Sequence, residues 1–379
     1  MTFLVANQKY TVPVIKKDQP DDSFKFQNLP DPTGKYPYRL SLDKVIPGKA
    51  GDTLAFHMVG DTGSLRSPDF QKLVAAQLED QFQVEEKPSF LYHLGDVVYN
   101  HGEIERFERQ FFEPYKHYPA PIFAIPGNHD SDVNPDNPVP YTSLSAFMQV
   151  FCAREAGAIA FSGGSERQSM IQPNMYWVLE TPLANIIGLH GNVTKYGAIR
   201  GEQEQWFVEQ LRWAASRHPD KALIVCIHHA PYSADINHGA SIPMIEFFER
   251  SYAETGVRPD IVFSGHVHNY QRFSKRYDDG AEVPFIVAGA GGYDELHAVA
   301  EVSDERFTSK NPLFEGVELK NFCDTKHGFL KVILSRKPEG VELVTEYYTI
   351  PHEMITEDFS PAALFDRKLI VIKNKKTLA

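Results

Sequence analysis

Side chains with metal-binding chemistry follow five short apolar runs of the sequence. The runs end at Gly60-Asp61, Gly95-Asp96, Gly127-Asn128-His129, His228 and Gly265-His266. Tyr99 comes three residues after Asp96, and His268 comes two residues after His266. Carboxylate and amide oxygens combined with imidazole nitrogens favour iron, manganese, zinc or a related ion over calcium. Seven or eight candidate ligands exceed the needs of one tetrahedral or octahedral ion, so the sequence predicts a site for two ions.

Each motif taken alone also has an ordinary structural explanation. Gly60-Asp61 alone is typical of a turn, and Tyr99 alone is typical of packing. His228 and His229 could be a core histidine and a loop histidine. The run Gly265-His266-Val267-His268 is more specific, because residue composition predicts only about 0.04 occurrences in a chain of this length. The shared pattern, in which each motif ends an apolar run, is what favours a common site.

The apolar runs are predicted to be strands of an α/β domain. We expect strands over 54–59, 90–94, 122–125, 176–179, 186–189, 222–227, 261–263, 285–288, 329–334 and 341–348. Apolar residues at helical spacing predict helices over 70–82 and 202–215. In open α/β sheets, ligands bind just beyond the carboxyl ends of the strands. If the strands share one sheet, the candidate side chains therefore meet at one edge of it.

The chain is predicted to have one large domain with an extension at each end. Residues 1–50 are polar, with Pro and Asp punctuation, which indicates an N-terminal extension or a small β addition. Residues 51–350 form the predicted catalytic domain, and 351–379 form a C-terminal extension. The insertion at 131–175 lacks clear periodicity and directly follows His129. We therefore expect it near the mouth of the site, as a fixed cap or a moving lid.

Composition excludes several classes of protein. The chain has 379 residues, of which 42% are hydrophobic, and a formal net charge of −12. This charge argues against a protein that coats nucleic acid, because such binding rests on clustered cations. No apolar run is long enough to span a membrane, and the first 20 residues do not resemble a signal peptide. The three cysteines are odd in number and far apart, so we expect a reduced, cytoplasmic protein.

The motifs together resemble the calcineurin-like metallophosphoesterase superfamily, and more narrowly its purple acid phosphatase branch. Most of the superfamily has Asp-x-His at the first motif, whereas Asp61-Thr62-Gly63 lacks that histidine. Tyr99 stands three residues after the second aspartate, as in the purple acid phosphatase pattern. Asn269-Tyr270-Gln271-Arg272 also resembles that branch. The resemblance covers roughly residues 53–350.

This resemblance implies an α/β fold, the metallophosphoesterase four-layer α/β/β/α sandwich, with a binuclear metal centre at the carboxyl ends of the strands. The first ion, Fe(III) in that branch, would be held by Asp61, Asp96, Tyr99 and His268. The second, an iron, zinc or manganese ion, would be held by Asp96, Asn128, His228 and His266, with Asp96 bridging the two.

The implied activity is hydrolysis of phosphate esters. In such centres a metal-bridging hydroxide attacks the phosphorus, and His129 would face the substrate oxygens and donate to the leaving oxygen. A small-molecule phosphate ester or another phosphorylated substrate is therefore expected, and a phosphomonoesterase like the purple acid phosphatases is preferred. A phosphodiesterase of the same fold is the alternative within enzymes. A non-catalytic binding protein of this fold is a further alternative, although such loss normally removes ligands.

Other residues are weaker candidates, and two features depart from the purple acid phosphatase branch. Asp130 and His229 are candidates for substrate binding, and Asp130 could instead orient a neighbouring histidine. The cationic candidates on the insertion side are Arg154, Arg167 and Lys195. We interpret His190, His238 and His297 as surface or packed histidines. The absence of a recognisable signal peptide and of the N-terminal sandwich domain of the larger plant forms means that secretion and an acidic optimum are not expected.

Overall fold

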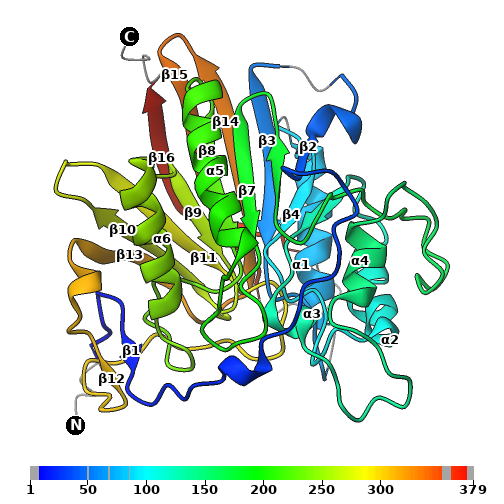
Figure 1. Cartoon of the computed structure of the whole chain (residues 1–379), viewed down its shortest axis with the longest axis horizontal. Coiled ribbons are helices and arrows are strands. Elements are labelled where there is room, and N and C mark those ends of the chain that lie inside the picture. The colour runs from blue at the N-terminus through cyan, green and yellow to red at the C-terminus, as the bar shows by residue number, and fades with distance from the viewer. Residues whose placement is uncertain (1–7, 49–50, 67–68, 85, 352–359, 374–379) are drawn as a thin grey trace.

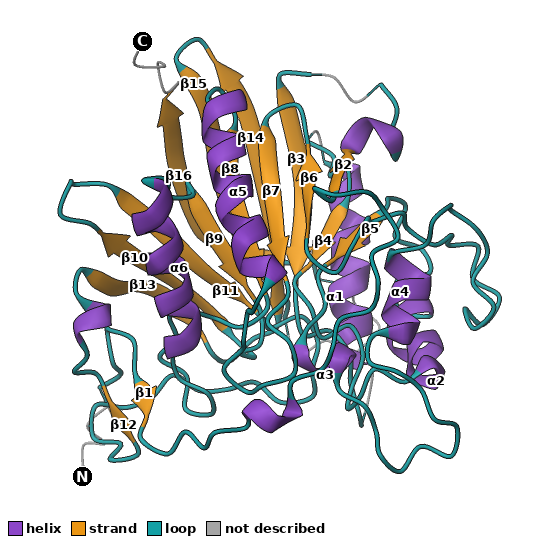
Figure 2. Ribbon diagram, in the orientation of Figure 1, coloured by secondary structure: helices purple, strands orange, loops and turns teal. Residues whose placement is uncertain are grey.

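The structure is a computed structural model that describes residues 8–48, 51–66, 69–84, 86–351 and 360–373. Two large β-sheets pack face to face, and each carries helices on its outer face (Figures 1 and 2). This arrangement is a four-layer α/β/β/α sandwich and confirms the predicted fold class. Among the described residues, no helix combines the length and hydrophobicity that crossing a bilayer requires.

The first large sheet has eight strands. In spatial order they are β13 (Val317–Cys323), β10 (Tyr270–Arg276), β11 (Glu282–Ala288), β9 (Ile261–Ser264), β8 (Ala222–Ile227), β7 (Ala184–Leu189), β6 (Trp177–Glu180) and β2 (Arg39–Ser41). The central strands β7, β8, β9 and β11 run parallel, while β6 pairs with β7 as an antiparallel hairpin. The carboxyl ends of β8 and β9 therefore open at the same edge of the sheet.

The second large sheet has six strands. In spatial order they are β16 (Ala363–Lys373), β15 (Gly340–Thr349), β14 (Gly328–Lys337), β3 (Thr53–Val59), β4 (Leu91–His93) and β5 (Ile122–Ala124). Strands β3, β4 and β5 are parallel, and β14, β15 and β16 form an antiparallel meander beside them. A small separate sheet pairs β1 (Ile15–Lys16) with β12 (Phe307–Thr308).

Most of the helices cover the outer faces of the two sheets, while α3 lies at the strand ends. The described helices are α1 (Asp69–Asp80), α2 (Ile104–Phe107), α3 (Asn128–Ser131), α4 (Ser145–Phe151), α5 (Glu202–Arg217) and α6 (Ile242–Thr255), with short 3-10 helices η1 (Ser23–Lys25), η2 (Leu42–Lys44), η3 (Gln81–Gln83) and η5 (Pro312–Phe314) and a π-helix η4 (Glu108–Phe112). Helices α5 and α6 lie against the eight-stranded sheet, while α1, α2 and α4 lie on the side of the six-stranded sheet (Figure 1).

The alternation of strand side chains separates two hydrophobic cores. In β3, Phe56 and Met58 face the core between the sheets, while Val59 faces the core under α1. In β4, Tyr92 faces the core between the sheets and Leu91 faces the core under α1. Successive strand residues point to opposite faces, so both faces of this sheet are covered by apolar packing. This two-sided burial explains why the central strands appear in the sequence as continuous apolar runs.

The ten predicted strands and the two predicted helices all correspond to observed elements, but several elements were not predicted. Helix α6, strands β10 and β13, and the edge strand β16 are additional. Strand β2 adds to the eight-stranded sheet from within 1–50, and β16 adds to the six-stranded sheet from within 351–379. The predicted extensions at both ends thus contribute strands to the main sheets.

The insertion at 131–175 has two parts. Residues 132–144 follow α3 as a loop at the same end of the sheets as α3 (Figure 1). The following helix α4 buries Phe147 and Phe151 in the core that also contains α1, so this part belongs to the helical layer. An isolated antiparallel β-bridge pairs the backbone of Cys152 with that of Ile171, so the two ends of the second part lie side by side. The first part alone lies at the end of the molecule where the predicted site is found.

Candidate metal centre

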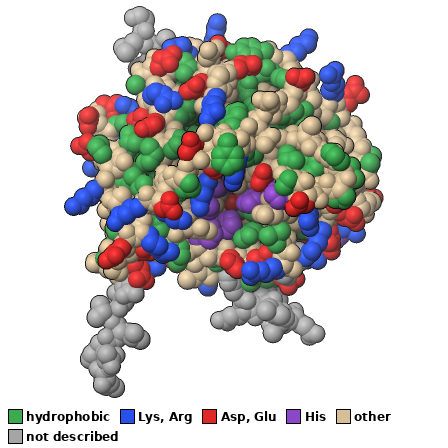
Figure 3. Space-filling view, turned by 60° about the horizontal axis from the view of Figure 1, so that its bottom comes forward, with side chains coloured by type: hydrophobic (Ala, Val, Ile, Leu, Met, Phe, Trp, Pro, Cys, Tyr) green, Lys and Arg blue, Asp and Glu red, His purple; other side chains and the backbone are tan. Residues whose placement is uncertain are grey.

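The candidate ligands come from both large sheets. Asp61, Asp96 and Asn128 follow β3, β4 and β5 of the six-stranded sheet. His228 follows β8, and His266 and His268 follow β9, in the eight-stranded sheet. The site therefore lies where the carboxyl ends of two facing sheets meet, rather than at the edge of one sheet. Figure 3 shows histidine side chains gathered in a hollow on this face of the molecule.

Asn128 and two histidines form one half of the site. The Asn128 Oδ1 atom lies 3.1 Å from His228 Nε2 and 3.0 Å from His266 Nδ1. Asp96 Oδ2 lies 3.3 Å from the same His228 nitrogen. One carboxylate, one amide oxygen and two imidazoles thus converge, which are the four residues expected to hold the second ion.

Tyr99 and His268 form the other half. The Tyr99 hydroxyl donates to Asp61 Oδ1 at 3.2 Å and lies 3.3 Å from His268 Nε2. His268 Nε2 is itself 3.6 Å from Asp61 Oδ1. Asp96 also contacts the Tyr99 hydroxyl, so its carboxylate lies between the two halves. This position is the one that a bridging ligand requires.

The outer ring nitrogen of each ligand histidine faces a backbone carbonyl. His228 Nδ1 lies 2.8 Å from the Leu94 oxygen, and His268 Nδ1 lies 3.2 Å from the Glu295 oxygen. His266 uses its other nitrogen, since Nε2 lies 2.9 Å from the Lys195 oxygen. A carbonyl only accepts, so each outer nitrogen carries a proton. Burial holds the pKa of both His266 and His268 well below its usual range, so the inner nitrogens of these rings present lone pairs to the centre. The inner nitrogen of His228 does so once its second proton is lost.

The His266 contact tests whether these residues suit a metal. With the proton on Nε2, the inner Nδ1 is an acceptor that faces the Asn128 oxygen at 3.0 Å. Burial, followed by the neighbouring His238, holds the pKa of His266 well below its usual range, so the ring is neutral. Two acceptors at this distance repel each other, and a cation between them removes the conflict. The donor set therefore fits a bound metal ion.

The two carboxylates create the same demand for positive charge. The side chains of Asp61 and Asp96 are both buried. Burial raises the pKa of Asp61 well above its usual range. Burial also opposes ionisation of Asp96, but the charge of His228 prevails and lowers the Asp96 pKa. Buried carboxylates are stable only when they are paired or bind a metal, so this pair of acids also fits a cation.

The backbone at the centre is held in an uncommon conformation. Asp61, Asp96 and His266 all have positive φ angles, of 58°, 54° and 69°. Such a φ is strained for a side chain as large as that of histidine, and strain of this kind concentrates at functional sites. The His266 amide donates to both Asp61 oxygens, at 3.0 and 2.8 Å, which holds this conformation in place.

Two glycines allow the loops to approach this closely. A Cβ atom on Gly265 would lie 2.6 Å from Asp61 Oδ2, and one on Gly127 would lie 2.0 Å from Asp96 Oδ1. Any side chain at these positions would displace a carboxylate. Gly127 and Gly265 are thus required by the lack of space next to the two carboxylates.

His129 stands beside the cluster of ligand atoms. Its Nδ1 lies 2.6 Å from the Asn100 oxygen, and its ring packs 4.5 Å from that of Tyr99. Its backbone amide donates to Asp96 Oδ1 at 2.9 Å. Within the described residues, no hydrogen bond engages the other ring nitrogen, Nε2.

Asp130 and His229 occupy different environments from those predicted. The buried Asp130 carboxylate accepts hydrogen bonds from the backbone amides of Val97, Val98 and Gly127. It therefore joins the loops after β4 and β5, and this supports a structural role instead of substrate contact. His229 is fully buried behind the ligands, its ring 4.6 Å from that of His266. Neither residue faces the hollow as a substrate-binding group would.

Arg167, one of the cationic candidates on the insertion side, is also structural. Its guanidinium donates to the backbone oxygens of Tyr115, Tyr118 and Ala120. These contacts tie the insertion to the segment after η4 and engage both terminal nitrogens of the guanidinium.

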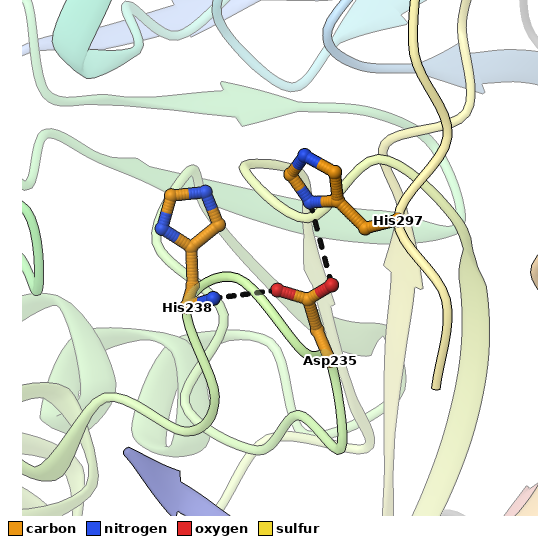
Figure 4. Close-up of side chains that lie close together, drawn as sticks. All are labelled: Asp235, His238 and His297. Atoms are coloured by element: carbon orange, nitrogen blue, oxygen red, sulfur yellow. Dashed lines mark hydrogen bonds and ion pairs between the residues drawn. The ribbon is translucent and has the colours of Figure 1, made fainter. Parts of the chain in front are cut away.

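One further group of possible ligands was not predicted from the sequence. Asp235, His238 and His297 bring their ligand atoms within 4.8 Å of one another (Figure 4). The His238 ring lies tilted 4.2 Å from that of His266, and the His297 ring stacks 4.3 Å from that of His268. The Asp-x-x-His spacing of Asp235 and His238 was a usable signal, but His297 is far away in the sequence. The ring contacts agree with our interpretation of His238 and His297 as packed histidines, but that interpretation did not predict the grouping with Asp235.

Comparisons with known proteins identify the family of this chain. Residues 54–270 match the family model of the calcineurin-like phosphoesterases. A probable glycerophosphodiester phosphodiesterase, GpdQ, of Arcobacter nitrofigilis is 27% identical over 154 residues, which are 40% of this chain and 45% of that protein. Purple acid phosphatase 15 of Arabidopsis thaliana is 26% identical over 212 residues, which are 54% of this chain and 36% of that protein. The matches thus span less than half of the length of either relative.

A solved structure shares the fold. The structure of GAP50, described as the anchor in the inner membrane complex of Plasmodium, superposes with a TM-score of 0.55 at 17% identity. The superposition covers 86% of this chain and 91% of that one. The resemblance predicted from the motifs is confirmed, because the matching family model spans more than half of the sequence, and a purple acid phosphatase is among the relatives. This chain belongs to the calcineurin-like phosphoesterase family.

Proposed function

We propose that this protein is a metal-dependent hydrolase of phosphate esters, and specifically a phosphomonoesterase of the purple acid phosphatase type. The carrying observation is the orientation of His228, His266 and His268. Each donates its outer proton to a carbonyl and turns its inner nitrogen toward the buried oxygens of Asp96, Asn128 or Asp61. A purely structural cluster of histidines has no need for this arrangement.

We assign the residues to two ions as the two halves of the site suggest. Asp61, Asp96, Tyr99 and His268 would hold the first ion, and Asp96, Asn128, His228 and His266 would hold the second. The Tyr99 phenolate is a hard anionic ligand, which supports Fe(III) at the first position. The second ion would be iron, zinc or manganese. Once bound, the ions would supply positive charge to the phosphate oxygens and lower the pKa of an attached water.

The residues of the chain itself would orient the substrate. We place the His129 Nε2 atom toward the substrate, because its Nδ1 is held by the Asn100 carbonyl. In this orientation it can donate to a phosphate oxygen or to the leaving oxygen. The His129 amide donates to the Asp96 carboxylate. The loop after β5 therefore carries the proposed substrate-facing imidazole and also holds the proposed bridging carboxylate, which comes from the loop after β4.

Phosphodiester hydrolysis is the second candidate. The match to a probable glycerophosphodiester phosphodiesterase favours it, whereas Tyr99 and the match to a purple acid phosphatase favour monoesters. A diester carries one fewer negative charge and a second ester group, so the two classes of substrate can be separated directly by assay.

The first test is the metal content of protein purified without added metal or chelator, followed by hydrolysis assays. We expect about two tightly bound ions per chain, including iron, and faster turnover of p-nitrophenyl phosphate than of bis(p-nitrophenyl) phosphate. The Tyr99→Phe variant should lose the visible absorption of an iron-phenolate bond. Two bound ions without iron would agree with the proposed metal-dependent hydrolase but contradict the purple acid phosphatase type. Less than one ion, not restored by iron, manganese or zinc, would favour the non-catalytic binding protein.

A further inference from the structure

A tight turn formed by residues 194–197 connects the proposed centre to the N-terminal part of the chain. The Gly197 amide donates to the Thr194 oxygen at 2.9 Å, and Gly197 has a φ of 76°, which glycine adopts without strain. In the middle of the turn, the Lys195 oxygen accepts from His266 Nε2 at 2.9 Å. His266 is one of the residues assigned above to the second ion. The place of this turn therefore sets the orientation of one proposed ligand.

Two other parts of the chain hold the turn. The Ser241 hydroxyl, which precedes the first residue of α6, donates to the Tyr196 oxygen. The Lys195 amide donates to Asp22 Oδ2 at 2.8 Å. Asp22 belongs to residues 17–27, which we call the N-terminal strap, and it stands 173 positions away from Lys195 in the sequence. Lys195 thus contacts the strap with its amide and His266 with its carbonyl.

Polar and ring contacts attach the strap to the loop that carries the turn. The Asn192 side chain accepts from the Gln27 amide and donates to the Gln27 oxygen, both at 2.9 Å. The Arg200 guanidinium lies over the Phe26 ring, 4.6 Å from its centre. None of residues 17–27, all of which the structure describes, belongs to a hydrophobic core. Specific contacts, and not apolar burial, therefore hold the strap in place.

Asp22 is the link between the strap and the turn itself. A surface cavity of about 370 Å³ is lined by strap residues 19–23, by 194 and 196–200, and by the first turns of α6. Open space therefore adjoins this part of the strap where apolar packing could otherwise support it. Within the described part of the chain, the contact between Asp22 and Lys195 is the one hydrogen bond that joins the strap to the turn.

We propose that Asp22 is a positioning residue for the second metal ion, and that it acts on His266 through the Lys195 peptide. This inference rests on the proposed function, because His266 is a ligand only if that centre exists. Loss of a partner that orients a metal-binding histidine lowers metal affinity by roughly 10- to 100-fold. Asp22 holds such a partner and does not touch the histidine, so we expect the lower end of this range. The first ion is independent of the turn, because His268 faces the Glu295 oxygen instead.

The test measures how tightly the second ion is held in the wild type and in Asp22→Ala. Both proteins would be depleted of their exchangeable ion with a weak chelator and equilibrated with buffers of graded free zinc. Zinc and iron per chain would then be measured by mass spectrometry. We expect Asp22→Ala to need about tenfold more free zinc than the wild type to fill the second site. Its iron content and its visible absorption should equal those of the wild type.

Three control variants separate the hydrogen bond from charge. Asp22→Asn keeps an oxygen that can accept from the Lys195 amide, so it should restore the wild-type zinc affinity. Asp18→Ala removes an exposed strap carboxylate that makes no hydrogen bond or ion pair among the described residues, and it should bind zinc like the wild type. Asp279→Asn is a distant control, because Asp279 pairs with Arg258 in the turn between β10 and β11, at the opposite end of β10 from His268.

Each failure has a distinct meaning. Wild-type zinc affinity in a folded Asp22→Ala variant would overturn this inference and leave the proposed function intact. Equal weakening in Asp22→Asn would also overturn it, because charge and not the hydrogen bond would then be responsible, and so would loss of iron together with zinc. Should Asp22→Ala fail to fold, Asp22→Leu replaces it, since leucine has a similar shape and no acceptor. A wild type that takes up no second ion would contradict the proposed function, and this inference with it.

Discussion

The buried contact between Asp96 and His228 should make the metal-free protein sensitive to alkaline pH. Burial alone would lower the pKa of His228, but the carboxylates of Asp96 and Asp61 raise it from 6.5 to about 9. A pKa that is higher in the folded state gives a stabilisation that is complete below about pH 6.5. This stabilisation is lost as the pH rises through about 9.

The size of the effect follows from the shift. Raising the pKa of His228 from 6.5 in the unfolded chain to about 9 in the folded protein corresponds to about 3 kcal/mol of unfolding free energy. Asp61 acts in the same direction, because burial raises its pKa and the folded state holds its proton above the usual range. Asp96 has a lowered pKa, so its contribution changes only at acidic pH and does not affect this range.

The assay is urea unfolding of chelator-treated protein, followed by tryptophan fluorescence at several values from about pH 6.5 to about pH 9. We expect the unfolding free energy to fall by about 3 kcal/mol across this range. Asp96→Asn should reduce the slope, since it removes the largest charge that raises the His228 pKa, while Asp279→Asn should leave the slope unchanged. Equal stability of the wild type at both ends of the range would refute the reasoning. Metal affinity should show the opposite trend, because an ion must displace the His228 proton.

Four substitutions test the other roles. Asp96→Asn with metals loaded should lose most turnover, because the carboxylate between the two halves is removed; near-normal activity would reject the site. His129→Ala should lower kcat by about 100-fold or more with unchanged metal content, and a parallel loss of metal would instead make it a ligand. Tyr99→Phe should fold normally and bind less iron relative to zinc, as metal analysis would show. Asp130→Asn should lower the unfolding free energy by about 1–3 kcal/mol in urea, since its carboxylate joins two loops; lost activity at full stability would restore a substrate role.

Much of the fold was predictable because both faces of the central strands are buried. Strands such as β3 and β8 appear in the sequence as unbroken apolar runs that end at a polar motif. Helix α6 was missed, although its signal is local: the Ser241 hydroxyl accepts from the Met244 amide, and Pro243 lies in the first turn. Strand β16 was missed for a different reason. It is an edge strand in which the apolar residues Leu369 and Val371 are exposed, so its sequence does not alternate between buried apolar and exposed polar residues.

The sequence by itself determined which chemistry gathers at the strand ends. Ligand types such as Asp61 and His228 stand directly after the apolar runs, and a strand carries its next residue to the edge of its sheet whatever the rest of the chain does. Residue identity and local order were therefore enough to predict a metal centre and its family.

Only the tertiary structure decided how these residues meet and which neighbours join them. Two sheets face each other, so Asn128 of one sheet lies against His266 of the other, a contact between residues 138 positions apart. Packing also assigned Asp130 to backbone amides and brought His297 next to Asp235. Such long-range contacts depend on how whole layers pack, and the chemistry of a single segment does not encode that packing.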